Sequence, residues 1–465
     1  MTRLALLSGL GHAVLVAASL LLYVMATRIG QQRRHPSTAL AWVVGLVAFP
    51  YVALPLFLLF GTRKFARPAR HQRAPAPAAD MPAGAPAWAT RLLSGMELAP
   101  AVPNDAVAFH ADGAASLQAL IGLIDSAEHS LDLCTFLFGN DAVGRSVTDA
   151  LLRCARRGVT THVLLDAVGG LQTPAPVLRQ WAGGGVRVRR FMPLLHNPLR
   201  GRTNLRNHRK LAVADGVRLW SGGRNLASEY FTDRPGRPAW TDLSFTVHGP
   251  LAAQALAQFR TDWRAARGRP HRAARILAPP VAPERSGGAL AQWVPSGPDH
   301  ADDTLHALLM SGAYQAQQRI WAATPYFVPD DALLDAWCLA CRRGVQVRLL
   351  LPRRSNHRLA DWARERALRQ LVAAGGEVWL APTMLHAKTV LIDGELALCG
   401  SLNLDARSLF LNYEAMAAFY GLGEVQWLSD WFEHQRALAQ PYRARPPSWA
   451  RDIFEGVVRA VGFQL

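Results

Sequence analysis

Two long apolar segments open the chain, at residues 4–27 and 38–60, and neither contains an acidic or basic charged side chain. Each has about 23 residues, which as an α-helix would extend roughly 35 Å at about 1.5 Å per residue. This length covers the hydrocarbon core of a bilayer, and the first segment is too long for a cleaved signal peptide. The pattern therefore predicts a transmembrane hairpin within residues 1–65.

The charges beside this hairpin predict its orientation. Its outer flanks carry six positive residues, whereas the turn between the segments carries three. By the positive-inside rule, both ends of the hairpin and the residues that follow it are expected in the cytoplasm. Alanine, proline and arginine dominate the start of the next stretch, so residues 66–100 are predicted to form a linker without a packed core.

The rest of the chain repeats one pattern of apolar and polar residues. In residues 101–280, an apolar strand-like run at 130–138 precedes a helical stretch that ends in Cys-Ala-Arg-Arg-Gly-Val. In residues 281–465, a similar run at 319–327 precedes a helical stretch that ends in Cys-Arg-Arg-Gly-Val. A further strand-like run follows each helix, so we predict an α/β sandwich built twice, with an amphipathic segment at the C-terminus.

Each half carries the same spacing of polar residues towards its end. From histidine to lysine is two residues, from lysine to aspartate five, and from histidine to asparagine 17, in both halves. A single copy would be an ordinary solvated strand with a hairpin turn, whereas two copies in register indicate one shared site. The members are His208, Lys210, Asp215 and Asn225 in the first half, and His386, Lys388, Asp393 and Asn403 in the second.

This pattern indicates phosphodiester chemistry. Alternation along a strand projects each histidine beside its lysine, and each asparagine returns to the same edge on the following strand. If the halves pack together, the two sets meet in one pocket, where lysine and asparagine neutralise charge on a phosphoryl transition state. One histidine can attack phosphorus and the other can protonate the leaving oxygen, so no metal and no other cofactor is expected.

The amino-acid composition indicates an anionic partner and shows one unusual feature, the scarcity of lysine. The formal net charge is +17, which favours nucleic acid or an anionic membrane surface. Nearly all of the positive charge is arginine, since the chain has only three lysines, Lys64, Lys210 and Lys388. Two of the three occupy the same slot of the repeat, so these slots are predicted to reject arginine.

The two blocks match the signature of the phospholipase D superfamily, H-x-K-x-x-x-x-D followed by G-[GS]-x-N. The runs 204–210, 400–408 and 411–414, together with the N-terminal hairpin, resemble bacterial cardiolipin synthases. The resemblance implies two tandem α/β sandwich halves related by pseudo-two-fold symmetry, and a covalent phosphatidyl-histidine intermediate. By the habit of the family, His208 is expected to be the nucleophile and His386 the acid.

The resemblance also assigns further residues to the site. A carboxylate is expected to orient each histidine, with Glu414 resembling the partner of His386 and Asp242 at the comparable position after the first motif. The alternative for Asp242 is an ordinary strand end at the surface. Gly223 stands where many members have serine, which leaves Ser401 alone as the serine expected to contact phosphate. Arginines also crowd the first motif and could hold lipid headgroups or form a solvated basic face: Arg200, Arg202, Arg206 and Arg209.

The leading expectation is transfer of a phosphatidyl group from one phosphatidylglycerol to another, with release of glycerol, at the inner membrane of a bacterium. Water or another alcohol as acceptor would instead make the chain a phospholipase D-type hydrolase or a different phosphatidyltransferase. A nuclease is disfavoured by the hairpin and by the lack of an aromatic and basic stripe for nucleic acid. The expected partners are anionic phospholipids, namely phosphatidylglycerol and cardiolipin, and a bacterial membrane, with no nucleic acid.

Replacing either paired lysine by arginine, as Lys210→Arg or Lys388→Arg, should lower the turnover rate although the positive charge is kept. We expect a loss of about tenfold or more, because the compact ammonium is exchanged for a bulkier planar fork. The measurement is the specific activity of each purified variant, with Lys64→Arg as the matched control outside both motifs. Wild-type rates in both motif variants would contradict the inference from the lysine count.

Overall fold

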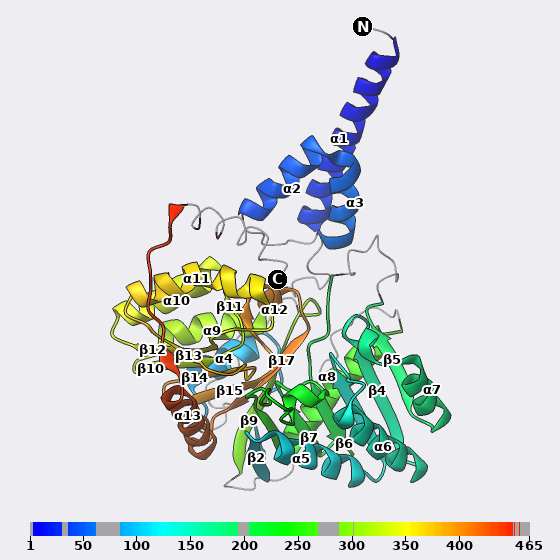
Figure 1. The fold of residues 1–465 in the computed structure, drawn as a ribbon, viewed down its shortest axis with the longest axis vertical. Coiled ribbons are helices and arrows are strands. Elements are labelled where there is room, and N and C mark those ends of the chain that lie inside the picture. The colour runs from blue at the N-terminus through cyan, green and yellow to red at the C-terminus, as the bar shows by residue number, and fades with distance from the viewer. Residues whose placement is uncertain are drawn as a thin grey trace.

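The chain folds into a group of N-terminal helices and a larger α/β body with two sheets (Figure 1). The mixed α/β domain occurs twice, as the sequence repeat predicts. The structure is a computed structural model, and it describes residues 3–29, 36–61, 84–193, 204–267, 288–300, 302–449, 451 and 455.

The first half of the body forms a seven-stranded sheet in the order β2-β8-β7-β6-β3-β4-β5. Strands β3, β4 and β5 run parallel, as helical crossovers between them require, and the remaining neighbours are antiparallel. The strands are β2 (Ala106–His110), β3 (Ser130–Thr135), β4 (Thr160–Asp166), β5 (Arg187–Phe191), β6 (Leu211–Ala214), β7 (Arg218–Gly222) and β8 (Ser244–His248).

The second half forms a nine-stranded sheet in the order β1-β9-β17-β15-β14-β10-β12-β13-β18. Seven of these strands repeat the order of the first sheet, with β1 and β18 added at the edges, and β11 pairs separately with β16. The strands are β1 (Val102–Asn104), β9 (Ala289–Ser296), β10 (Arg319–Ala323), β11 (Phe327–Val328), β12 (Gln346–Pro352), β13 (Glu377–Ala381), β14 (Thr389–Ile392), β15 (Leu396–Gly400), β16 (Leu404–Asp405), β17 (Glu414–Phe419) and β18 (Gln440–Pro441).

Three apolar clusters hold the body together. Helices α5, α6 and α7 pack on the first sheet, and α4, α9, α10 and α11 pack on the second. A third cluster joins the facing sides of both sheets with α8 and α13. The helices are α4 (Ala87–Gly95), α5 (Gly113–Asp125), α6 (Ala142–Arg156), α7 (Ala175–Gly183), α8 (Pro250–Ala265), α9 (Thr304–Gln315), α10 (Asp331–Arg342), α11 (Arg358–Ala373), α12 (Ala406–Phe410) and α13 (Leu422–Ala437).

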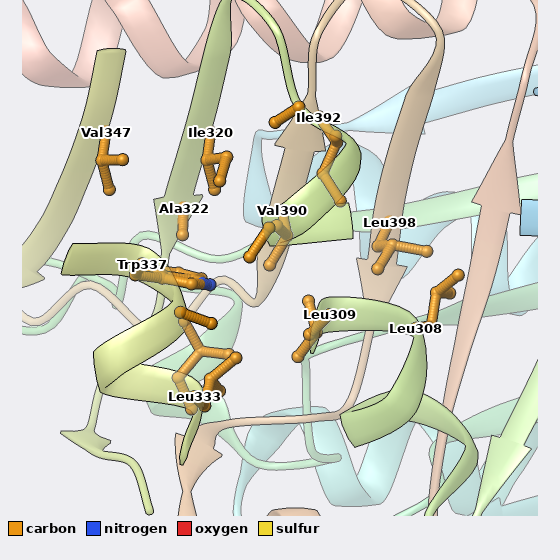
Figure 2. Packing of buried hydrophobic residues seen from close by; sticks show 14 of the residues in the cluster. Leu308, Leu309, Ile320, Ala322, Leu333, Trp337, Val347, Val390, Ile392 and Leu398 are labelled. Atoms are coloured by element: carbon orange, nitrogen blue, oxygen red, sulfur yellow. The ribbon is translucent and has the colours of Figure 1, made fainter. Parts of the chain in front are cut away.

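Figure 2 shows the cluster between the second sheet and its helices. Ile320 and Ala322 of β10 point towards Trp337 of α10, whereas the alternate residues Trp321 and Ala323 belong to the cluster between the sheets. Both faces of β10 are therefore buried, which explains why such strands read as continuous apolar runs rather than as an alternating pattern.

The predicted linker ends earlier than expected. Residues 87–95 form α4, and Ala89 and Leu93 are fully buried in the cluster that α4 shares with α9. These two residues are four apart and so lie on one face of the helix. This apolar pattern is too short to stand out in a stretch rich in alanine and proline, so it did not indicate a helix. Strand β1 also departs from the predicted start of the first half at 101, because it pairs with β9 of the second sheet. Residues 62–83 lie outside the described residues.

The N-terminal residues described form three helices, α1 (Arg3–Ile29), α2 (Pro36–Ala48) and α3 (Pro50–Phe60). Pro50 begins α3 and has no amide hydrogen to donate, so the second predicted span is broken at Phe49. Within the described parts of the chain, no helix combines the length and the apolar character needed to cross a membrane. The predicted hairpin of two spans is therefore not supported.

The predicted C-terminal amphipathic segment is described only in part. Trp449 is exposed, while Arg451 Nε donates to Glu455 Oε1 over 2.9 Å. Glu455 is buried and also accepts from Arg369 of α11. This part of the segment thus packs on α11, and residues 456–465 lie outside the described residues.

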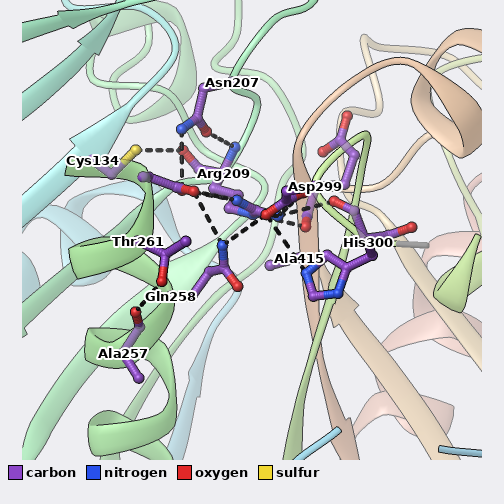
Figure 3. A network of polar contacts seen from close by, with 12 residues as sticks. Cys134, Asn207, Arg209, Ala257, Gln258, Thr261, Asp299, His300 and Ala415 are labelled. Atoms are coloured by element: carbon purple, nitrogen blue, oxygen red, sulfur yellow. Dashed lines mark hydrogen bonds and ion pairs between the residues drawn. The ribbon is translucent and has the colours of Figure 1, made fainter. Parts of the chain in front are cut away.

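A buried ion pair network lies where the two halves meet (Figure 3). Arg209 Nη1 donates to Asp262 Oδ1 over 2.7 Å, and Nη2 donates to the carbonyl oxygen of Ser296 over 3.0 Å. Nε donates to the carbonyl oxygen of Glu414 over 3.0 Å, and Asp299 lies 3.4 Å from Nη2. Burial disfavours the charge, but Asp262 and Asp299 outweigh it and raise the pKa of Arg209. Arg209 therefore ties the halves together and is neither solvated nor a headgroup ligand.

Candidate active site

A cavity of about 650 Å³ lies between the two halves. Residues from both repeats line it, because the segment just before β6 and the segment just before β14 both reach this cavity. Both histidines, both lysines and both asparagines of the motifs line this cavity, as the strand alternation predicts: His208, Lys210, Asn225, His386, Lys388 and Asn403.

The backbone at each histidine is bonded to the opposite half. The amide of His208 donates to the carbonyl oxygen of Tyr413 over 2.9 Å, and the amide of His386 donates to that of Thr241 over 2.7 Å. Asn207 and Tyr413 form an isolated parallel bridge, and Thr241 forms the matching bridge with Leu385. The residue that follows Tyr413 or Thr241 is a carboxylate, so each bridge brings a carboxylate to a histidine of the other half.

The carboxylates therefore pair across the two halves. Asp242 Oδ2 lies 2.6 Å from His386 Nδ1, and Glu414 Oε1 lies 3.3 Å from His208 Nδ1. The predicted pairing, Glu414 with His386 and Asp242 beside the first motif, is wrong in both cases. Order along the chain suggested a partner within the same half, whereas the bridges between the halves decide the partner.

Burial lowers the pKa of both imidazoles. Burial, and next the neighbouring lysine, lower the pKa of His208, and they lower the pKa of His386 to about 3. Burial also opposes ionisation of Asp242 and Glu414, but the facing histidine and lysine outweigh it and lower both pKa values. An ionised carboxylate against Nδ1 favours the tautomer with its proton there, which leaves Nε2 free to act on phosphorus.

The two lysines fold back over their own motifs. Lys210 Nζ donates to the carbonyl oxygen of His208 over 2.7 Å, and Lys388 Nζ lies 3.1 Å from Nε2 of His386. Burial lowers the pKa of Lys210, and burial together with Lys210 lowers the pKa of Lys388 to about 7 although Asp242 opposes the shift. An anionic phosphate in the cavity favours the charged form of both lysines.

Ser401 lies behind the cavity. Its Oγ donates to Glu414 Oε2 over 2.6 Å, so the predicted contact between Ser401 and phosphate is not supported. The hydroxyl instead holds the carboxylate that faces His208. At the matching position, a Cβ on Gly223 would lie 2.2 Å from Asp242 Oδ1, which explains why this copy of the repeat has no side chain there.

Asp215 and Asp393 lie at the far ends of β6 and β14, outside the cavity. Asp215 Oδ1 accepts from the backbone amides of His129 over 2.8 Å and of Ser130 over 2.9 Å. Asp393 makes the same kind of contacts at the start of β10. Their predicted place in the catalytic set is therefore wrong, since they clamp the turn after each motif strand to the start of a neighbouring strand.

The comparisons with known proteins agree with this geometry. The family model of the cardiolipin synthase, phospholipase D-like domain matches residues 120–263 and 310–436, one segment in each half and together more than half of the chain. The chain belongs to this phospholipase D-like cardiolipin synthase family. The predicted resemblance is thereby confirmed, and the chain is a phosphatidyltransferase enzyme.

Relatives within the cardiolipin synthase family match most of the chain. Cardiolipin synthase A of Pseudomonas aeruginosa is 34% identical over 423 residues, which are 87% of this chain and 85% of that protein. Cardiolipin synthase A of Escherichia coli O1:K1 / APEC is 30% identical over 480 residues, covering 97% and 96%. The crystal structure of phosphatidylserine synthase from Haemophilus influenzae Rd KW20 covers 81% of this chain and 100% of its own, with a TM-score of 0.63 and 14% identity, which shows the fold.

Aromatic residues around the histidines of this family member were not predicted. Phe136 packs edge-on against His208 with ring centroids 4.4 Å apart, and Tyr230 and Trp240 pack on His386 at 5.0 and 5.5 Å. The repeat could not reveal them, because the matching positions of the other half hold no aromatic residue: Pro325, Ser408 and Asn412.

The site carries no sign of a resident metal in the part of the chain described. Within those ranges, no group of three or more histidine, cysteine, aspartate or glutamate side chains is placed to hold a metal ion. Independence of the reaction from metal stays a prediction. Of the arginines near the first motif, Arg206 lines the cavity with Nη1 3.3 Å from Asp166 Oδ1, whereas Arg200 and Arg202 lie outside the described residues.

The crossed pairing predicts which side chains are coupled energetically. In a double-mutant cycle, His386→Ala and Asp242→Ala should show a coupling energy of about 0.5–3 kcal/mol in the free energy of unfolding, because they are in contact. His386→Ala with Glu414→Ala should be nearly additive. Chemical denaturation of the purified protein and its variants gives both values, and a larger coupling with Glu414 would contradict the crossed arrangement.

Asp215→Asn should destabilise the protein by about 1–2 kcal/mol while leaving the turnover rate per folded molecule close to wild type. Burial opposes ionisation, but the amides of Ser130 and His129 outweigh it and lower the pKa of Asp215 to about 2. Its stabilising effect is therefore present above its unfolded pKa and is lost as the pH falls through about 2. The midpoint of denaturation and the rate measure the two effects separately, and a large loss of rate without loss of stability would restore a catalytic role.

Proposed function

We propose that this chain transfers the phosphatidyl group of one phosphatidylglycerol to a hydroxyl of a second phosphatidylglycerol, which forms cardiolipin and releases glycerol. The observation that carries the proposal is the meeting of two histidine, lysine and asparagine sets around one cavity. Membership in the cardiolipin synthase family supports the choice of substrate. The cavity also holds Asn225 Oδ1 and Asn403 Oδ1, which are buried and accept no hydrogen bond within the described structure, so substrate hydroxyls can donate to them.

In the first step, His208 Nε2 forms a bond to phosphorus as the bond from phosphorus to the glycerol oxygen breaks. His386, in the protonated form that the bound anionic phosphate favours, donates its Nε2 proton to that oxygen, and free glycerol leaves. In the second step, a hydroxyl of the acceptor lipid attacks phosphorus, His386 takes its proton, and the bond from phosphorus to His208 breaks. Lys210 and Lys388 face the phosphoryl oxygens throughout and balance the charge that develops on them.

The contacts of the two carboxylates support this division of roles. Asp242 lies 2.6 Å from His386 and stabilises its imidazolium, as an acid requires. Glu414 is shared with Ser401 and Asn412 and lies farther from His208, at 3.3 Å, which stabilises a cation there less. These contacts favour His386 as the acid and His208 as the nucleophile.

The N-terminal helices support attachment to a membrane. Tyr23, Leu46 and Phe57 pack them on one another, while many large apolar side chains remain exposed. A lipid surface would cover this area and bring the cavity close to its substrates, consistent with a bacterial inner membrane and a cytoplasmic active site. The exposed residues include Leu10, Val14, Leu21, Leu40, Val44, Phe49, Tyr51 and Val52.

Purified full-length protein in vesicles of phosphatidylglycerol alone should form cardiolipin and free glycerol in near-equal amounts, with phosphatidic acid as a minor product. Because each step needs a nucleophile and an acid, His208→Ala and His386→Ala should each lower the rate by about a hundredfold or more. His248→Ala is the matched control, since His248 pairs with Asp105 on the surface away from the cavity.

Mass spectrometry of the lipids and an assay for glycerol measure this outcome. Phosphatidic acid as the main product would make the enzyme a hydrolase, and a product that needs another added alcohol would identify a different transferase. Rapid acid quenching with labelled lipid should trap the label on His208 and not on His386, which tests the division of roles.

A further inference from the structure

Cardiolipin synthesis brings two phosphate groups into one site. The donor phosphate sits between the two motifs, but the acceptor lipid carries a phosphate of its own, which stays intact while its glycerol hydroxyl attacks. Charge on this second phosphate needs a cation outside the two motif lysines. A cation that binds only the phosphate of the acceptor lipid would favour this lipid over water as the attacking molecule.

Two arginines line the cavity from opposite halves. Arg206 is buried and lies two residues before His208, and Arg407 stands on α12 of the second half. Arg407 Nη1 donates to Asn204 Oδ1 over 3.0 Å, and Nη2 donates to the Asn204 carbonyl oxygen over 2.8 Å. Arg407 therefore reaches across to the chain segment that leads into the first motif.

Carboxylates lie near both of these arginines. Asp166 lies 3.3 Å from Arg206 and offsets its charge. Burial disfavours the charge of Arg407; next, Asp405 supports it and Arg206 opposes it, so the pKa of Arg407 is lowered overall. Burial raises the pKa of Asp405 itself to about 6, with Ser408 opposing the shift and Glu414 adding to it. A phosphate bound beside Arg407 would add a negative charge there and favour the charged guanidinium.

This cationic corner exists on one side of the repeat only. Arg407 follows the motif asparagine of the second half by four residues, and the matching residue of the first half is Glu229. Arg206 precedes the motif histidine of the first half by two residues, and the matching residue of the second half is Met384. Glu229 faces Arg234 over 3.3 Å and does not line the cavity. The cavity thus has a strong binding corner for one additional anion, beside the entry to the first motif.

We propose that Arg407, assisted by Arg206, binds the phosphodiester of the acceptor lipid and so selects phosphatidylglycerol over water or free glycerol as the attacking molecule. This inference rests on the proposed function. Of the arginines expected to hold lipid headgroups, it retains Arg206, and it assigns the acceptor to the side of the cavity formed by α12.

The test compares two acceptors in the same protein. Cardiolipin formation uses an acceptor that carries a phosphate, whereas exchange of radiolabelled glycerol into phosphatidylglycerol uses an acceptor without one. In Arg407→Gln, the ratio of cardiolipin formation to glycerol exchange should fall by about tenfold or more, because a charge-assisted contact to the acceptor alone is lost. Arg407→Lys should lower the ratio less, since it keeps the charge but not the planar fork.

Two control variants separate binding from structure. Asn204→Ala removes one hydrogen-bond acceptor of Arg407 and leaves the cation, so its ratio should stay closer to wild type. Arg153→Gln, on the outer surface of α6 where Arg153 pairs with Asp125 over 2.9 Å, should leave the ratio unchanged.

A ratio in Arg407→Gln equal to that of wild type would overturn the inference, whether both rates fall or neither does. Full reproduction of the effect by Asn204→Ala would also overturn it, because Arg407 would then act only by holding Asn204. Failure of the proposed function is visible in the wild-type protein itself, which would exchange glycerol without forming cardiolipin and would overturn both statements.

Discussion

The exchange of carboxylates between the two halves is the constraint on which the site depends. Each histidine donates its amide to a carbonyl oxygen of the opposite half, and the next residue there is the carboxylate that faces its ring. Neither half alone holds a histidine beside its carboxylate. The site therefore exists only while the interface is closed, and anything that loosens the interface loosens both catalytic pairs together.

The same interface accounts for the buried charge around the cavity. Arg209 lies between His208 and Lys210 in sequence, yet its guanidinium points away from the cavity into Asp262 and Asp299. Removing it would take the guanidinium away from two buried carboxylates, at a cost of about 3–5 kcal/mol. On the cavity side, burial lowers the pKa values of the imidazoles and the lysines, so an anion bound in the cavity would favour their charged forms.

The two halves repeat in fold but not in chemistry. Ser401 bonds Glu414, while Gly223 leaves Asp242 close to His386. Tyr230 and Trp240 pack on His386, whereas Phe136 packs on His208. Arg407 of the second half stands at the position that Glu229 occupies in the first half. These differences let two similar histidines take different roles and let one corner of the cavity differ from the other.

The sequence by itself determined the features that depend on neighbours along the chain. Equal spacing in two copies predicted the doubled α/β fold and the six cavity residues, since the period of a strand sets which side chains project together. It also singled out Lys210 and Lys388, because lysine is rare in a chain that otherwise uses arginine. The spacing also included Asp215 and Asp393, although it did not reveal what the aspartates do.

Only the tertiary structure decided which groups face one another. Bridges between distant segments give Asp242 to His386 and Glu414 to His208, and nothing in the order of the chain distinguishes this from pairing within each half. Packing likewise took Ser401 out of the cavity, buried Arg209, and fixed α4 on α9 through only two fully buried side chains. The physical reason is common to all of these: spacing sets the direction of a side chain on its own strand or helix, but burial and the choice of partner depend on surfaces that meet only when the chain has folded.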